Sequence, residues 1–244
     1  MEPLLRLTGV NKSFGALTVS DNVTFDLPKG QALGIIGPNG AGKSTLFNLI
    51  GGALAPSSGT VMFKGQDVTA QQASARCRAG IARSFQIPHP FVGMTVFENL
   101  LVASSFGGAG HHDPREACYD ILERTGLLPK ANRPAGSLTL LERKRLELSR
   151  ALATGPELLL LDEIAGGLTE AECHALVETI QAIHASGVSI IWIEHIVHAL
   201  LAVVDRQIVI DFGKIVAEGA PRAVMADPMV QEIYMGISVD DQAA

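Results

Sequence analysis

The fold of this chain is decided by a short stretch between an apolar run and a helical pattern, Gly37-Pro38-Asn39-Gly40-Ala41-Gly42-Lys43-Ser44. The apolar run before it, Ala32 to Ile36, predicts a buried strand. After it, apolar residues recur at helical spacing from Lys43 to Ile50. Strand, glycine-rich turn and helix follow one another as the pattern G-x-x-x-x-G-K-[ST] requires, and this context makes the match specific.

The glycine-rich turn is expected to bind nucleotide phosphate. Glycines allow successive backbone N–H groups to curl round an anion, and the N-terminus of the following helix adds positive potential. Lys43 is predicted to reach the terminal phosphates and Ser44 to ligate Mg²⁺. The alternative is a chance glycine turn before a helix, against which the full pattern argues. The predicted nucleotide-binding residues of this stretch are Gly37, Asn39, Gly40, Ala41, Gly42, Lys43, Ser44 and Thr45.

A second pattern is a run of four leucines, Leu158 to Leu161, that ends in Asp162 and Glu163. The run predicts a buried strand, and the carboxyl end of a parallel strand is where open α/β sheets place ligands. Adjacent strand residues point in opposite directions, so the two acids should have different tasks. Asp162 suits the Mg²⁺ shell, and Glu163 suits polarising an attacking water. A solvated pair of loop acids is the alternative.

Composition restricts the class of protein. The 244 residues are 47% apolar, enough for a substantial core, and the net charge is −6 without a long basic block. Nucleic acid is therefore not an expected partner. The cysteines, Cys77, Cys118 and Cys173, lie far apart and suggest no metal knuckle, which fits a reducing cytosolic compartment. No secretory signal is recognisable in residues 1–15.

One apolar segment, Val188 to Phe212, is long enough to cross a bilayer. Its interior contains Glu194, Asp205 and Arg206, and each charge costs roughly 2 kcal/mol or more near a bilayer centre. A transmembrane span is therefore rejected.

The order of predicted elements indicates a single α/β domain over residues 1–244, with strands that alternate with helices and so predict a mainly parallel sheet. We expect a catalytic core at 1–86 and 156–225, a helical subdomain at 87–155 and a C-terminal extension at 226–244. The predicted strands are Leu4–Leu7, Val23–Leu27, Ala32–Ile36, Leu158–Leu161 and Val188–Ile193. The predicted later helices are Val96–Ser104, Pro114–Thr125, Leu140–Thr154 and Glu170–Ser186.

With the glycine-rich turn, the two acids and a helical insert between them, the chain resembles the ABC (ATP-binding cassette) ATPases over almost its whole length. The resemblance implies a P-loop NTPase fold with an N-terminal antiparallel β subdomain, a mainly parallel core sheet and an inserted α-helical subdomain. It also implies ATP and Mg²⁺ as cofactors and ATP hydrolysis as the reaction.

The resemblance assigns further residues. Gln86, in Arg83-Ser84-Phe85-Gln86, matches the Q-loop glutamine, which senses Mg²⁺ and the reacting phosphate. His195 matches the switch histidine that contacts the γ-phosphate, and Gly166-Gly167-Leu168 falls where the D-loop runs between two subunits. Phe14 matches the aromatic residue that stacks on adenine, although a core position is an alternative for it.

One family motif departs from its pattern, because the usual Leu-Ser-Gly-Gly-Gln signature is replaced by Leu138-Thr139-Leu140-Leu141-Glu142. Thr139 and Glu142 keep a capping-box spacing, so a helix that starts there would present its dipole and a hydroxyl to a partner's γ-phosphate. Leu140 and Leu141 add bulk where glycine permits close approach. We therefore hypothesise that the chain pairs with a different ATPase whose signature is intact, or that it is a partner of low turnover.

Three weaker patterns have plain interpretations. The run Arg143-Lys144-Arg145 is expected to be a solvated helix face. His111-His112-Asp113 lies among glycines and is interpreted as a mobile loop rather than a metal site. His195 and His198 are predicted to share a helix face at i, i+3, but no further ligand accompanies them.

Two segments resemble importers of branched-chain amino acids, whose relatives also carry urea, amides and other small solutes. They are Phe85–Pro88 leading to Phe91–Leu100, and the tail Asp227–Gly236. The resemblance implies membrane-spanning permease subunits, a second ATPase subunit and, indirectly, a solute-binding protein. It places the chain peripherally on the cytoplasmic side of the inner membrane. The alternative function is a non-transport ABC ATPase that acts on nucleic acid or ribosomes.

Overall fold

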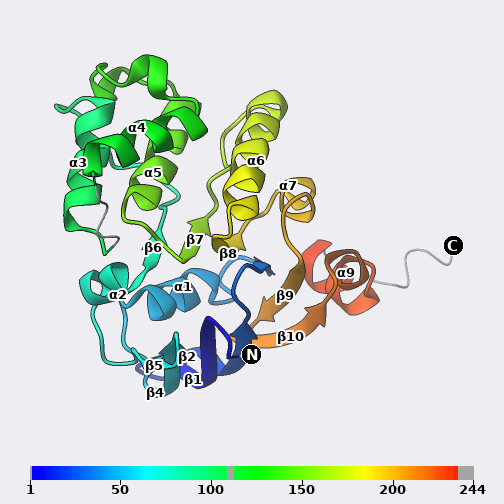
Figure 1. Cartoon of the computed structure of the whole chain (residues 1–244). Coiled ribbons are helices and arrows are strands. Elements are labelled where there is room, and N and C mark those ends of the chain that lie inside the picture. Colours follow the sequence, from blue (N-terminus) through cyan, green and yellow to red (C-terminus); the bar gives the residue numbers. More distant parts are fainter. Residues whose placement is uncertain (1, 109–112, 236–244) are drawn as a thin grey trace, which may run out of the picture.

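The computed structural model describes residues 2–108 and 113–235. Its N-terminal part is an antiparallel sheet in the order β2-β1-β4-β5, and in Figure 1 this sheet lies at the lower edge of the molecule. Register shifts interrupt both pairings of β1, which bend this long strand. The strands are β1 (Leu5–Phe14), β2 (Leu17–Leu27), β4 (Ser58–Phe63) and β5 (Gln66–Asp67).

The central sheet has the order β10-β9-β3-β8-β7-β6. Its pairings are parallel from β9 to β6, and only the terminal hairpin of β9 and β10 is antiparallel. Every residue of β3, β7 and β8 is buried, as expected for parallel strands that are covered on both faces. The strands are β3 (Ala32–Ile36), β6 (Ile81–Arg83), β7 (Leu158–Asp162), β8 (Ser189–Ile193), β9 (Arg206–Asp211) and β10 (Lys214–Gly219).

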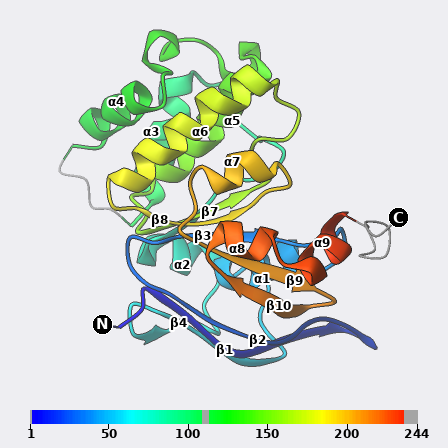
Figure 2. The same ribbon diagram turned by 90° about the vertical axis from the view of Figure 1, so that its right-hand side faces the viewer.

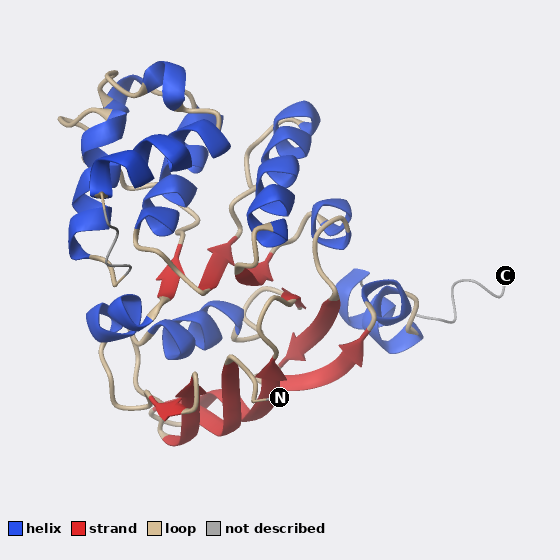
Figure 3. Ribbon diagram, in the orientation of Figure 1, coloured by secondary structure: helices blue, strands red, loops and turns tan. Residues whose placement is uncertain are grey.

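The helices fall into groups that Figure 3 separates clearly from the strands. α3, α4 and α5 lie together at the upper left, while α6 and α7 lie beside them over the central sheet. The helices are α1 (Lys43–Gly51), α2 (Ala73–Ala79), α3 (Val96–Phe106), α4 (Pro114–Arg124), α5 (Leu140–Ala153), α6 (Glu170–Ala185), α7 (Val197–Leu201), α8 (Pro221–Met225) and α9 (Pro228–Met235).

Local sequence explains where the longer helices begin. Threonine at the N-cap and glutamate three residues later form complete capping boxes at α3, α5 and α6. Each box satisfies backbone N–H groups that the first turn leaves without partners. Asp113 caps α4 in a similar way, and Pro114 occupies the first turn, where its missing N–H costs nothing.

Two hydrophobic cores lie on opposite faces of the central sheet. The alternating leucines of β7 divide between them: Leu159 and Leu161 join the helical side, and Leu158 and Leu160 join the side of α1 and the antiparallel sheet. Figure 2 shows the resulting layers, with α6 above the central strands and β1, β2 and β4 below. The leucine run is therefore continuous because each face of the strand is buried.

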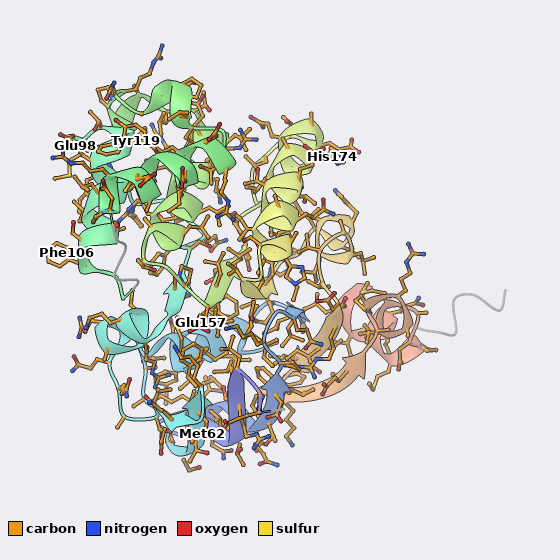
Figure 4. The ribbon with its side chains drawn as sticks, in the orientation of Figure 1. Met62, Glu98, Phe106, Tyr119, Glu157 and His174 are labelled. Carbon is orange, nitrogen blue, oxygen red and sulfur yellow. The ribbon has the colours of Figure 1, made fainter. Side chains whose placement is uncertain are left out.

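Polar contacts also join the layers. The carboxylate of Glu157, just before β7, pairs with Lys29 at 2.8 Å and with Lys64 at 2.6 Å. Figure 4 places Glu157 between the helical part, where Glu98 and Tyr119 lie, and the antiparallel sheet, where Met62 lies.

The apolar segment from 188 to 212 contains β8, the five-residue α7 and the whole of β9, with loops between them. Among residues 2–108 and 113–235, no helix combines the length and the apolar content that a bilayer crossing needs. α7 begins at Val197, so His195 precedes it, and the prediction that His195 and His198 share a helix face is wrong. His111 and His112 lie outside the described residues.

Candidate active site

The glycine-rich turn connects β3 to α1, as predicted. Gly37 and Gly42 have φ of 153° and 103°, and an added Cβ would lie 2.0 Å from the carbonyl oxygen of Ile210 and 2.2 Å from that of Val19, respectively. No side chain fits at such distances from backbone atoms. The turn is thus pressed against β2 and β9 at Gly37 and Gly42.

Lys43 lies at the start of α1 and is buried. Its ammonium group donates to the carbonyl oxygens of Gly37 at 2.7 Å and Pro38 at 2.9 Å. Burial lowers the pKa of Lys43, and the fields of Glu163 and Asp162 oppose this shift. The adjoining cavity collects most of the predicted phosphate-binding residues, since it is lined by Val19, Asn39, Gly40, Gly42, Lys43, Ser44, Thr45 and Glu163.

Asp162 is the last residue of β7 and forms an ion pair with Arg83 at the end of the neighbouring strand β6. The distance from Nη2 of Arg83 to Oδ2 of Asp162 is 2.6 Å. Arg83 also donates to the side chain of Asn48 on α1 at 2.6 Å, and its guanidinium lies 5.6 Å from the ring centroid of Phe47. Sequence reasoning missed Arg83, whose only signal was its place two residues before Phe85 and three before Gln86.

Glu163 directly follows β7 and has a φ of 45°, which is unusual for a residue other than glycine. Its carboxylate accepts from Nε2 of Gln86 at 2.6 Å through Oε2, and Oε1 lies 2.8 Å from Nε2 of His195. The three predicted catalytic residues, which come from three separate loops, therefore meet at one carboxylate. The left-handed backbone at Glu163 is a local strain of the kind that accumulates at functional sites.

Glu194 was not predicted from the sequence. It is almost fully buried, and its carboxylate accepts backbone N–H groups from Ala165 at 3.1 Å, His195 at 3.0 Å and Ile196 at 3.4 Å. Burial raises the pKa of Glu194, although these hydrogen bonds partly offset that effect. Glu194 thereby joins the His195 loop to the loop that follows Glu163.

The prediction for the Arg143–Arg145 run is wrong at its centre. Arg143 is exposed as expected, but Lys144 is only 4% exposed. The ammonium group of Lys144 donates to the carbonyl oxygen of Gln86 at 2.6 Å. Periodicity alone could not show this, because the contact depends on how α5 packs against a loop 58 residues earlier.

Comparison with known proteins agrees with this geometry. The family model described as ABC transporter matches residues 20–166. The chain is 35% identical to the high-affinity branched-chain amino acid transport ATP-binding protein LivG of Escherichia coli K12, with 96% of this chain and 98% of that protein covered. It is 34% identical to the probable branched-chain amino acid transport ATP-binding protein LivG of Methanocaldococcus jannaschii, with 96% and 97% covered.

The chain belongs to the ABC transporter family. Among solved structures, an ATP-binding cassette of an ABC transporter in its ADP conformation superposes with a TM-score of 0.89 at 33% identity, over 97% of this chain and all of that one. A nucleotide-free cassette superposes with a TM-score of 0.88 at 34% identity, over the same shares of the two chains. The predicted ABC ATPase fold is confirmed.

The signature segment of this ABC protein lines a different cavity from the one beside the phosphate-binding loop. Leu140, at the start of α5, is 45% exposed, and an added Cβ on Gly167 would lie 3.4 Å from it. Leu140 lines a second cavity together with Gln86, Ile87, Pro88, Lys144, Gly166 and Gly167. Thr139 and Glu142 form the predicted capping box, and Glu142 also pairs with Lys130.

The predicted adenine-stacking residue, Phe14, is the last residue of β1 and is 50% exposed. The alternative that it belongs to the core is therefore wrong. The ammonium group of Lys12 lies 5.2 Å from the centroid of its ring.

The site offers hard oxygen donors for a metal, namely the hydroxyl of Ser44 and the carboxylate of Asp162. Within the part of the chain that the structure describes, no group of three or more His, Cys, Asp or Glu side chains is arranged to hold a metal ion alone. Mg²⁺ commonly takes only one or two protein ligands and completes its shell with phosphate oxygens and water. The residues present fit that arrangement.

Proposed function

We propose that this chain is the ATP-binding and ATP-hydrolysing subunit of an importer for branched-chain amino acids or related small solutes. The observation that carries the proposal is the meeting of Gln86, Glu163 and His195 beside a phosphate-binding loop. The similarity to the branched-chain amino acid transport ATP-binding proteins extends over nearly the full length of both chains and supports the solute class.

The backbone amides from Gly37 to Ser44 hold the triphosphate at the N-terminus of α1. Lys43 then exchanges its contacts with the carbonyls of Gly37 and Pro38 for phosphate oxygens. Phe14 stacks on the adenine. Ser44, Asp162 and Gln86 would hold Mg²⁺, which would neutralise phosphate charge.

Hydrolysis requires a polarised water molecule. Glu163 lies within reach of the phosphate-binding loop and acts as the base that accepts a proton from the attacking water. His195 contacts the γ-phosphate and orients the carboxylate through the bond between Nε2 and Oε1. Glu194 keeps the His195 loop in place.

The signature segment and the exposed apolar side chains of this chain support the choice of partners. A second ATPase subunit with an intact signature completes the site on this phosphate-binding loop, because Leu140 and Leu141 replace the glycines of this chain's own signature. Exposed apolar side chains after Gln86 support contact with a membrane permease on the cytoplasmic side: Ile87, Phe91, Val92 and Met94. The helical region 87–155 then carries nucleotide-driven closure to that permease.

The decisive experiment is Glu163→Gln in the full chain, assembled with subunits that copurify from membranes. Steady-state ATP hydrolysis is expected to fall by about a hundredfold or more, since a general base is lost, while ATP affinity is retained. Glu178→Gln removes an exposed carboxylate from α6 and serves as the matched control. Undiminished hydrolysis in Glu163→Gln would remove Glu163 from this role.

The same preparation distinguishes a subunit that hydrolyses ATP from the low-turnover alternative. A wild-type assembly in which this chain's phosphate-binding loop binds ATP but hydrolyses none in a single turnover would favour it. The identities of the copurifying chains, read by mass spectrometry, test the permease and the second ATPase together.

A further inference from the structure

Arg83 is a largely buried cation beside the candidate metal ligand Asp162, and the proposed mechanism gives it no role. In the parallel pairing of β6 with β7, Arg83 lies opposite Leu160. Leu160 and Asp162 are two residues apart on β7, so their side chains point to the same face of the sheet, which is the face of α1. The strand register thus brings the guanidinium of Arg83 and the carboxylate of Asp162 together on that face.

The guanidinium group is held by neighbours from several elements. Nη2 donates to Oδ2 of Asp162 at 2.6 Å, and Nη1 donates to the side-chain oxygen of Asn48 on α1, also at 2.6 Å. Its central carbon lies 5.6 Å from the ring centroid of Phe47 and 5.1 Å from that of Phe85. A guanidinium is a rigid planar fork, so two hydrogen bonds to different elements fix its orientation as well as its place.

This pairing leaves Asp162 with one oxygen for a metal ion. Oδ2 is engaged by Arg83, and within residues 2–108 and 113–235 no hydrogen bond or ion pair reaches Oδ1. The number of oxygens matters because Ca²⁺ accepts both oxygens of one carboxylate in a flexible shell, whereas Mg²⁺ is smaller and demands nearly octahedral geometry. A carboxylate that offers a single oxygen therefore suits Mg²⁺ better than Ca²⁺.

We propose that Arg83 is a positioning residue that holds Asp162 by Oδ2, so that the site offers Oδ1 alone and favours Mg²⁺ over Ca²⁺. The inference rests on the proposed function, which assigns Asp162 to the metal ion that accompanies ATP. Arg83 acts through this carboxylate, since its printed donors are directed to Asp162 and Asn48. Groups that orient a metal ligand in this way commonly change metal affinity by about 10- to 100-fold.

The inference is tested by calorimetric titration of the full chain with a non-hydrolysable ATP analogue in Mg²⁺, in Ca²⁺ and in EDTA. In Arg83→Met, the ratio of the affinity in Mg²⁺ to that in Ca²⁺ is expected to fall by about tenfold. Loss of the positive charge strengthens the attraction of both divalent ions alike, so the ratio reports the geometry of the carboxylate. The affinity in EDTA should be retained, because the phosphate-binding loop and Lys43 are unchanged.

Arg78→Met is the matched control, because it removes an exposed arginine from α2 and should leave the ratio unchanged. An unchanged ratio in Arg83→Met, an equal fall in Arg78→Met, or an equal loss of affinity in EDTA and in Mg²⁺ would overturn the inference. Emission of the single tryptophan, the buried Trp192, checks that each variant is folded. If Arg83→Met does not fold, Asn48→Ala frees Nη1 of Arg83 instead, with an expected fall of about threefold and the same deciding outcomes.

The same titrations separate this inference from the proposed function. A wild-type chain that does not bind the analogue in Mg²⁺ would refute the proposed function. A wild-type preference for Mg²⁺ that is lost in Asp162→Asn but kept in Arg83→Met would overturn the inference alone. Loss of the preference in both variants, with binding in EDTA retained, would support the inference and the metal site together.

Discussion

The phosphate-binding loop and the signature segment each precede the N-terminus of a helix, α1 and α5 respectively, but only the loop requires glycine. At Gly37 and Gly42 a side chain would collide with the backbone of Ile210 and Val19, so the chain's own fold demands glycine there. At Leu140 the fold makes no such demand, because this side chain is 45% exposed, and even a Cβ added to Gly167 would meet it at 3.4 Å, an ordinary contact distance.

This difference shows where each constraint originates. At Gly37 and Gly42 the loop is confined by backbone of the same chain, so a side chain there is resisted before a ligand arrives. The signature segment keeps what its own helix needs, the capping box of Thr139 and Glu142. It lacks glycine at Leu140, which is exposed, and at Leu141, which packs partly against the core. The loss of glycine is thus compatible with a stable chain, and its consequences are expected in the assembled pair.

The largest effect is expected from Lys43→Ala. Removal of the buried ammonium group should weaken ATP binding by about a hundredfold, since charged hydrogen bonds to phosphate are lost. Calorimetric titration with ATP measures it, and Lys29→Ala, which removes an exposed lysine, is the control. Normal affinity in Lys43→Ala would refute the assignment of the loop.

A comparison of Gly42→Ala with Gly40→Ala tests whether the close approach to backbone makes glycine necessary. Gly42→Ala places a Cβ against the carbonyl of Val19, whereas at Gly40 nothing lies within 4 Å of the added atom. Both residues have positive φ, so alanine at either position costs about 1 kcal/mol of backbone strain. The two variants then differ only in the collision with the carbonyl of Val19. ATP affinity should fall by about tenfold more in Gly42→Ala than in Gly40→Ala. Equal losses would show that the close approach does not matter.

Loss of the capping hydroxyl of Thr139 should have a smaller effect than the substitutions in the phosphate-binding loop, and it should act on folding stability. Thr139→Ala should lower the free energy of unfolding by about 1 kcal/mol, because the first turn of α5 loses an acceptor for the N–H of Glu142. Urea denaturation measures the change. Thr139→Ser keeps the hydroxyl and should keep the stability, so an equal loss in both variants would contradict the capping explanation.

The smallest effect is expected from Leu140→Gly. Glycine at the exposed start of a helix should cost less than about 1 kcal/mol of folding stability. If the bulk of Leu140 weakens hydrolysis at the opposite nucleotide, the assembled pair should hydrolyse ATP faster with glycine there. A fall in hydrolysis, with each chain still folded, would instead make leucine the residue that this interface requires.

Much of the architecture was predictable. The strand Ala32–Ile36, the turn and the helix after it form as expected, because apolar periodicity and glycine placement act over a few residues. Strands β9 and β10 were not predicted, because β9 lies inside a long apolar segment whose ends the composition does not mark. Helix α3 also extends two residues beyond the predicted Ser104, although both added residues, Ser105 and Phe106, are exposed.

The sequence by itself determined the phosphate-binding turn, the acids at the end of a buried strand and the start of α5 at Thr139, because each depends on neighbours within a few positions. Only the tertiary structure decided that Arg83 pairs with Asp162, that Lys144 holds Gln86 and that Gln86 reaches Glu163, across 79, 58 and 77 residues respectively. Such contacts depend on which strand ends and helix faces are neighbours in space, and no local pattern along the chain records that.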